Sequence, residues 1–414
     1  MKNYIFKYIN KLSAIVLIIW SVGTFVACED TNDGSYKITE GIPEVYYVRF
    51  SNPDVADSLI VGAYMEQNIC LVGNNLTSIK ELYFNDQKAL LNINFITNNT
   101  LLVNVPRTIP TTVTNKIYMI TGNNDTIPYD FKVLVPNPIV SSISCEHIVD
   151  GGIATIYGDY LLDDPNKPLT ITMAGNVKVT EILNIQKTQV TFKIPTGSQK
   201  GNINVSTIYG NGRSSFIFRD DRGIFLNFDN LRADGSWRPG TIEGNPTYSI
   251  SGNYLKFSGS LGGGAWEWGD EAGFACYLWG QANGRPDAPL FTSDVASSIF
   301  KFEVNVLNKW SSVAMQFVFC DWNTSGNGPN SSAAYPRALW MPWQGKGADG
   351  FTTNGWVTVS IPLKDFKFDA GGNVLDKLPS KLGSFVIHVL QGGVEGIACS
   401  PTILIDNVRV VPAE

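Results

Sequence analysis

Aromatic and acidic residues gather in the last third of this 414-residue chain, where nine of its ten tryptophans follow residue 236. Trp266 and Trp268 stand one residue apart in GGGAWEWGDE, behind three glycines and among three carboxylates. In an extended segment the two rings project from one face, about 6.6 Å apart at ~3.3 Å per residue, and the glycines at 262–264 leave room for a close approach. Such rings can stack on the apolar C–H face of a β-linked hexopyranose, so the pattern predicts a glycan platform.

Four more tryptophans stand in segments rich in glycine, asparagine and serine, which are poor places to build a core. We therefore expect them to extend the platform, with nearby polar side chains bonding the sugar hydroxyls. The predicted ligand-binding residues are Trp266, Trp268, Trp279, Trp322, Trp340, Trp343, Glu267 and Arg285, with Asp270, Asn283, Gln344 and Lys346 beside them. Trp310 and Trp356 flank strand-like runs and are assigned to packing, and Trp237 fits either role.

Catalytic chemistry is the main alternative for this region. A glycoside hydrolase needs two carboxylates ~5–9.5 Å apart, and Glu267, Asp270 and Glu271 are candidates, with Asp287 or Asp321 as a further partner. No GxSxG, Walker A or HExxH motif occurs, and the two histidines, His147 and His388, lie about 240 positions apart. We therefore expect no catalytic residues and no cofactor, with His388 a strand residue.

Two aspartates in this region raise the hypothesis of a structural metal site. Asp229 and Asp406 stand in the two apolar-Asp-Asn-apolar segments that frame residues 222–414, and they could help to hold a structural Ca²⁺. Local capping of a strand end is the favoured interpretation for both, so no metal site is predicted.

The elements that position these residues are predicted to be β-strands throughout. Alternating or continuous β-branched runs such as EVYYVRF, TLLVNVP and TQVTFKIP are separated by Gly, Asn, Asp and Pro, a pattern typical of all-β sandwiches. ICLVGNNL (residues 69–76) also matches ATIYGDYL (residues 154–161), which aligns Gly73 with Gly158 and Leu76 with Leu161. A repeat of about 85–90 residues has the size of a domain.

The two repeats resemble the IPT/TIG immunoglobulin-like domain in their hydrophobic-x-G-x-x-L motif and in later strands that end at Pro106 and Pro195. That resemblance implies spacer domains at 36–135 and 136–221, with the PNP at 136–138 as a stiff joint. Residues 222–414 resemble a galactose-binding-like jelly roll of the kind found in carbohydrate-binding modules. The predicted fold is therefore two tandem immunoglobulin-like sandwiches followed by a larger jelly-roll β-sandwich.

The N-terminus has the features of an export signal. A basic segment with three lysines precedes LSAIVLIIWSVGTFVA (residues 12–27); a transmembrane anchor is the alternative, although a span needs ~20 apolar residues. FVAC resembles a lipobox, which implies a signal peptide at 1–27, a lipidated Cys28 and a tether at 28–35. The other five cysteines are odd in number and without a CxxC, which predicts buried small apolar side chains.

The whole order resembles the surface glycan-binding lipoproteins of Bacteroidetes polysaccharide-utilisation loci, which end in a domain of the xyloglucan-binding type. The resemblance implies a non-catalytic protein on the outer face of the outer membrane that binds xyloglucan, mixed-linkage β-glucan or β-mannan. A TonB-dependent importer and surface glycanases are the implied partners. Nucleic acid is excluded because the chain without residues 1–27 has a net charge of 28 − 37 = −9. An adhesin that binds host protein through the repeats is a further alternative.

Overall fold

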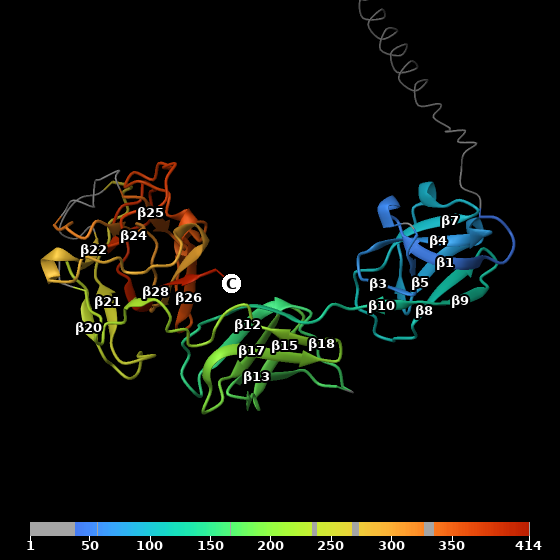
Figure 1. Cartoon of the computed structure of the whole chain (residues 1–414), viewed down its shortest axis with the longest axis horizontal. Coiled ribbons are helices and arrows are strands. Elements are labelled where there is room, and N and C mark those ends of the chain that lie inside the picture. Colours follow the sequence, from blue (N-terminus) through green and yellow to red (C-terminus); the bar gives the residue numbers. More distant parts are fainter. Residues whose placement is uncertain are drawn as a thin grey trace, which may run out of the picture. The chain divides into compact units, whose positions relative to one another are not determined.

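The computed structural model describes residues 38–55, 57–165, 167–233, 238–266, 273–326 and 335–413 (Figure 1). Within these ranges the regular structure is β-strand, interrupted by short 3-10 helices and by no α-helix. The 3-10 helices are η1 (Pro53–Val55), η2 (Leu76–Ser78), η3 (Ile93–Phe95), η4 (Gln281–Asn283), η5 (Val295–Ser297), η6 (Gly347–Asp349) and η7 (Leu363–Asp365). The chain divides into two compact units, one ending at Pro136 and one beginning at Asn137.

The first unit is a sandwich of two antiparallel four-stranded sheets with a short parallel pair. One sheet has the order β2 (Leu59–Ile60), β1 (Glu44–Phe50), β4 (Asn68–Asn74), β7 (Thr100–Asn104), and the other β6 (Gln87–Lys88), β5 (Ile79–Phe84), β8 (Lys116–Thr121), β9 (Thr126–Asp130). The parallel pair is β3 (Gly62–Tyr64) with β10 (Lys132–Leu134). In β8 the residues alternate between half-buried and buried, as expected for strands with one face on a core.

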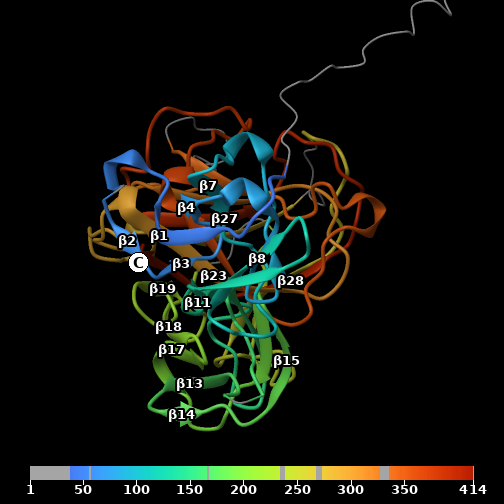
Figure 2. The ribbon, with the colours of Figure 1, turned by 90° about the vertical axis from the view of Figure 1, so that its right-hand side faces the viewer.

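The second sandwich has the same construction and begins the second unit. Its sheets have the orders β11 (Ile139–Ile143), β12 (Ile153–Asp159), β16 (Gln189–Lys193), β15 (Ile182–Gln186) and β14 (Val177–Lys178), β13 (Thr170–Ala174), β17 (Gln199–Thr207), β18 (Gly210–Arg213). The latter four strands lie together in Figure 2. A core of buried aliphatic side chains with Phe192, Phe216 and Phe218 joins the two sheets.

The repeated motif has the same physical basis in both sandwiches. A Cβ on Gly73 would lie 1.9 Å from the Glu44 carbonyl oxygen, and one on Gly158 would lie 1.8 Å from the Ile139 carbonyl oxygen. Only glycine tolerates this approach, because the neighbouring strand is bulged at that point. Leu76 and Leu161 are both fully buried. The repeat predicted from the sequence is therefore a repeat of backbone contacts.

The C-terminal sandwich is larger and consists of two antiparallel sheets. The large sheet has the order β20 (Thr241–Glu243), β21 (Tyr254–Ser258), β28 (Thr402–Pro412), β23 (Ser298–Val306), β26 (Val357–Pro362), with β19 (Ile224–Leu226) also on β28. The small sheet has the order β22 (Phe274–Leu278), β27 (Ser384–Val389), β24 (Met315–Cys320), β25 (Arg337–Trp340). The predicted all-β architecture, with two smaller sandwiches before a larger one, is confirmed, and the domain limits stay a prediction.

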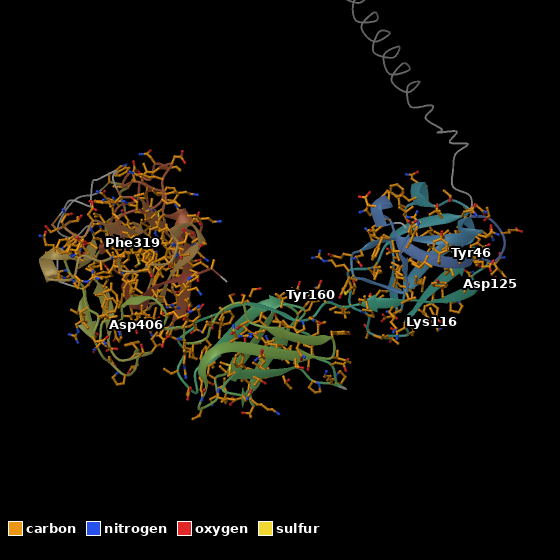
Figure 3. All side chains as sticks on the ribbon, in the orientation of Figure 1. Tyr46, Lys116, Asp125, Tyr160, Phe319 and Asp406 are labelled. Atoms are coloured by element: carbon orange, nitrogen blue, oxygen red, sulfur yellow. The ribbon has the colours of Figure 1, made fainter. Side chains whose placement is uncertain are left out.

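The core between the large and small sheets is dominated by phenylalanine. Phe300, Phe317, Phe319 and Phe385 are fully or almost fully buried, and their ring centroids lie 4.7–6.4 Å apart. Phe319 lies in the interior of this body in Figure 3. Such offset and edge contacts are the favoured geometries for aromatic pairs, so this core is a rigid support for the loops that leave the sheets.

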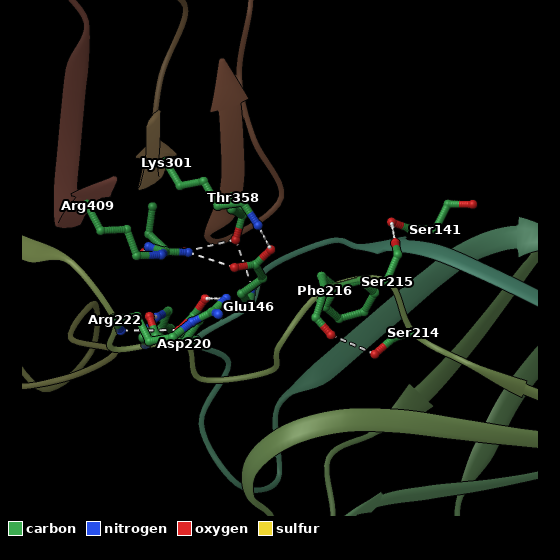
Figure 4. Close-up of polar contacts among 12 residues, drawn as sticks. Ser141, Glu146, Ser214, Ser215, Phe216, Asp220, Arg222, Lys301, Thr358 and Arg409 are labelled. Atoms are coloured by element: carbon green, nitrogen blue, oxygen red, sulfur yellow. Dashed lines mark hydrogen bonds and ion pairs between the residues drawn. The ribbon is translucent and has the colours of Figure 1, made fainter. Parts of the chain in front are cut away.

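A buried charge network joins the second sandwich to the outer face of the large sheet (Figure 4). Glu146, from the second sandwich, accepts hydrogen bonds from Lys301 Nζ at 2.6 Å and from Arg409 Nη2 at 2.8 Å. Arg409 is fully buried and also donates to both carboxylate oxygens of Glu303, at 2.7 and 3.0 Å. Thr358 Oγ1 accepts from the Glu146 amide at 2.7 Å. Side chains far apart in the sequence thus form one structural unit.

Some predictions fall on residues outside the described ranges. They are the signal peptide, the tether and Cys28, together with Trp237, Glu267, Trp268, Asp270 and Glu271. Among the residues that are described, no helix is long and apolar enough to cross a membrane.

Candidate functional site

The small sheet is buried on both faces. Every residue of β22, β24 and β27 is buried, because long loops cover the side that faces away from the core. The covered side carries a polar row in which His388 Nε2 lies 3.2 Å from the Tyr277 hydroxyl and Arg337 Nη1 donates to Gln316 Oε1 at 2.9 Å. Burial lowers the pKa of His388 to about 3, so this histidine is a neutral strand residue, as predicted.

Trp266 is the most exposed of the tryptophans that the structure describes, with 52% of its surface accessible. Its ring rests on two loops that come from distant parts of the sequence. A Cβ on Gly393 would lie 3.3 Å from Trp266 Cζ2, and a Cβ on Gly371 would lie 3.6 Å from Trp266 Cη2. Gly393 also has φ +73°, a conformation that favours glycine. The Cζ2–Cη2 edge of the indole thus lies against two glycines, and about half of the side chain is exposed to solvent.

Both supporting loops are fixed by hydrogen bonds. Asp369 accepts from the Gly371 amide at 2.8 Å and from the Asn373 amide and side chain at 2.9 and 3.0 Å. These bonds lower the pKa of Asp369, which keeps the carboxylate ionised and the turn closed. The loop leading to Trp266 is held by a bond from the Gly396 amide to the Gly263 carbonyl at 2.8 Å. At Gly263 the chain itself makes a close approach, because a Cβ there would lie 3.0 Å from the Gly396 carbonyl oxygen.

Two predicted platform residues near this end belong to the core instead. Trp343 is only 7% exposed, and its indole N–H donates to the Val313 carbonyl at 2.8 Å. Trp340 is half-buried, with its ring centroid 5.4 Å from that of Phe302 and 5.5 Å from that of Trp310. The expectation that both stand free on loops is wrong, because Trp340 is the last residue of β25 and both rings lie against the aromatic core. Trp310, assigned to packing, is fully buried.

Two other predicted tryptophans, Trp279 and Trp322, lie at the opposite end of the small sheet, where β22 and β24 finish. Trp279 is 7% exposed and its ring packs 4.6 Å from that of Tyr277, so the expectation of an exposed Trp279 is also wrong. Trp322 is half-buried, and its indole N–H donates to the Arg285 carbonyl at 2.9 Å. The structure thus brings Trp322 and Arg285 together, but it does not join them to Trp266.

The topology shows how the predicted set divides. Gly393, which supports Trp266, follows β27, whereas Trp322 follows β24. Because β24 and β27 are antiparallel neighbours, residues that follow them lie toward opposite ends of the sheet. The six residues of β24 alone span ~17 Å. The single platform expected from the sequence is therefore replaced by two separate tryptophan positions.

The two aspartates considered for calcium have protein partners. Asp229 Oδ1 accepts from the Asn253 amide and side chain at 2.7 and 2.9 Å. Asp406 accepts from Ser251 Oγ at 3.1 Å and from the Asn407 amide at 2.7 Å. Asp229 thus has the local capping role that the sequence favoured. Asp406 does not, because it is fully buried inside β28 and not at a strand end. In the part of the chain that the structure describes, no group of three or more potential metal-ligating side chains occurs.

The functional residues that sequence reasoning missed are the glycine supports. Gly371 and Gly393 lie against the ring of Trp266, yet neither is near Trp266 in the sequence. The stretch DAGGN, residues 369–373, is a recognisable turn signal. The turn alone does not indicate which ring it supports.

Comparison with known proteins connects this geometry with a family. A family model described as surface glycan-binding protein B xyloglucan binding domain matches residues 218–412. The crystal structure of surface glycan-binding protein PbSGBP-B from Prevotella bryantii is 33% identical, with a TM-score of 0.74 over 91% of this chain and 100% of that chain. An IPT/TIG domain-containing protein of Bacteroides ovatus is 24% identical over 210 residues, 46% of this chain and 41% of the relative. The chain thus spans less than half the length of that curated relative.

Proposed function

Because the chain belongs to the surface glycan-binding protein B family, we propose that its C-terminal sandwich captures a β-linked plant polysaccharide on the Trp266 platform. Proteins of this family bind glycans and are not catalytic, which removes the glycoside hydrolase alternative based on Glu267, Asp270 and Glu271. The observation that carries the proposal is a half-exposed indole seated on two glycine loops.

Xyloglucan is the ligand we place first, because the family model that matches residues 218–412 is that of a xyloglucan-binding domain. Mixed-linkage β-glucan and β-mannan follow. Their β-linked backbones present flat C–H faces that can stack on Trp266, with Trp268 and Glu267 proposed as the continuation of the platform. These contacts are mostly uncharged, so binding is expected to change little with salt. Affinity should rise with chain length, because a polymer offers many equivalent segments.

The remaining parts of the chain suit display at the cell surface. We propose that lipid on Cys28 anchors the protein to the outer membrane and that the two smaller sandwiches serve as spacers. A captured polysaccharide would then be held near surface glycanases and a TonB-dependent importer. The spacer role is supported by the absence of tryptophan from residues 21–236.

Titration calorimetry tests the function directly. The chain without residues 1–28 is titrated with xyloglucan, mixed-linkage β-glucan, β-mannan and starch, and products are examined by chromatography. We expect saturable binding of a β-glycan without cleavage. W266A should weaken it by roughly thirtyfold, the loss typical of a tryptophan at the centre of a binding surface.

Tyr46→Ala is the matched control, because Tyr46 is 57% exposed and lies in the first unit (Figure 3). It should bind like the unmodified chain. Failure to bind any polymer would contradict the function. Full binding by W266A would contradict the platform.

A further inference from the structure

A cavity of about 230 Å³ opens at the end of the small sheet where β24 finishes and β27 begins. Its lining includes Asp287, Asp321, Trp322, Ser380 and Lys381. This is the end opposite to Gly393, the support of Trp266. The cavity therefore lies apart from the Trp266 platform, at the other end of the same sheet.

The Trp322 ring at this cavity is held in one position. Its indole N–H bonds the Arg285 carbonyl at 2.9 Å, and its own carbonyl accepts from the Gln281 amide at 2.9 Å. A Cβ on Gly280 would lie 2.2 Å from Trp322 Cδ1, and a Cβ on Gly383 would lie 2.6 Å from Trp322 Cβ. Gly280 thus lets the backbone approach one edge of the indole, and Gly383 lets it approach the backbone and Cβ of Trp322. A fixed ring loses little conformational entropy when a ligand stacks on it.

Polar side chains surround the ring with balanced charge. Asp321 Oδ1 lies 3.0 Å from Lys381 Nζ, and the two side chains remain 36% and 56% exposed. The Tyr335 hydroxyl donates to Asp321 Oδ2 at 3.2 Å. With Asp287 and Arg285 the cluster has two positive and two negative groups, so it offers hydrogen-bonding groups without net attraction for an ion. An aromatic ring beside exposed donors and acceptors of balanced charge suits a neutral, hydroxyl-rich ligand.

We propose that this Trp322 cavity is a second contact for the captured polysaccharide, which takes a neutral pyranose unit of the same chain. The inference rests on the proposed function. It adds that binding is bivalent within one domain, because a saccharide must bridge more than the ~17 Å of β24 to reach both tryptophans. A short oligosaccharide occupies one contact, and a polymer occupies both, which raises its affinity through effective concentration.

Two probes of different length test the proposal, namely polymeric xyloglucan and a xylogluco-oligosaccharide of one repeat unit. W322A should weaken binding of the polymer roughly three- to tenfold, the size expected of one aromatic contact, and leave the short probe unchanged. K381M should produce the same selectivity with a smaller loss, because it removes an exposed ammonium without opening the core. K193M, which removes a similarly exposed lysine from the second sandwich, is the control and should bind both probes normally.

The outcomes separate this inference from the proposed function. If the unmodified chain binds neither probe, the proposed function fails. If it binds both and the two variants keep full affinity for the polymer, only the second contact is wrong. Equal loss for both probes also overturns it, since that result indicates a structural effect on the Trp266 platform. If thermal unfolding shows that W322A does not fold, K381M decides the question alone.

Discussion

The two sheets of the C-terminal sandwich have outer faces that are covered in different ways. The outer face of the large sheet carries Lys301, Glu303 and Arg409, and the second sandwich covers them with Glu146. The outer face of the small sheet is covered by loops of its own domain, which leave Trp266 half-exposed.

The two faces differ in whether their side chains remain free to contact a ligand after the chain has folded. On the large sheet, buried carboxylates and cations are engaged with one another across the junction, so the face holds two domains together. On the small sheet, the glycine loops contact one edge of the Trp266 ring and leave about half of the side chain exposed. The first face is consistent with a structural role and the second with binding, although both lie on one sandwich.

Removing Arg409 should produce the largest effect. R409M leaves Glu303 and Glu146 buried with Lys301 as their remaining cation in this network, and breaking a buried pair in this way costs about 3–5 kcal/mol. We expect the free energy of unfolding to fall by that amount in urea titrations followed by tryptophan fluorescence. This signal reports on the C-terminal region alone, because the tryptophans outside the signal segment all follow residue 236.

K367M provides the control for this prediction, because it lies in the same C-terminal region. Lys367 lies 3.6 Å from Asp365, and both side chains are a little under half-exposed, so its loss should cost less than ~1 kcal/mol. Glycan affinity of folded R409M should match that of the unmodified chain. An unchanged unfolding free energy in R409M would contradict the structural role of the large-sheet face.

Asp406 tests the structural role of the large-sheet face through the pH dependence of the free energy of unfolding. It lies opposite Glu303 across β23 and β28, near Asp229, and burial raises its pKa from the ordinary 3.8 to about 8. Between about pH 4 and pH 8 the native state therefore holds a proton that the unfolded chain has lost. Raising the pH through this window lowers the free energy of unfolding by at most about 1.4 kcal/mol per pH unit for this group.

D406N removes that titration while keeping the shape of the side chain. The difference in unfolding free energy between D406N and the unmodified chain should grow in favour of D406N from pH 5 to pH 8 and then level. Taking the difference between the two proteins cancels the contribution of the histidines, whose pKa values are lowered by burial. That contribution has the opposite sign, because it lowers the free energy of unfolding as the pH falls. A difference that is independent of pH would show that Asp406 is already ionised in the native state.

The sequence predicted the strands and the repeat because these depend on local patterns. Gly73 and Gly158 mark bulged strand pairs that recur in both small sandwiches, and four of the five cysteines described are buried, as expected. The exposure of each tryptophan could not be predicted locally. Trp340 stands in a turn-rich segment, but its ring packs on Phe302, 38 positions earlier.

The charge network could not be predicted from the sequence for the same reason. Glu146 and Arg409 are 263 positions apart, and nothing near either residue indicates a partner. Long-range contacts of this kind also decide which ring is presented at the small sheet. The glycine supports of Trp266 are therefore the most direct way to test whether the open indole is a consequence of the loops.

Gly393 gives the smallest and most specific expected effect. G393A adds a Cβ 3.3 Å from Trp266 Cζ2 at a residue with φ +73°, so it should displace the ring and weaken glycan binding roughly three- to tenfold. It should also cost roughly 1 kcal/mol of stability, because alanine disfavours positive φ. G197A is the matched control, since Gly197 has φ +85° and no atom within 4 Å of its Cβ position. It should lose similar stability and keep full affinity in the same calorimetric titration. Equal affinity in the two variants would mean that Gly393 does not position the platform. The difference between the two faces would then not depend on how Trp266 is supported.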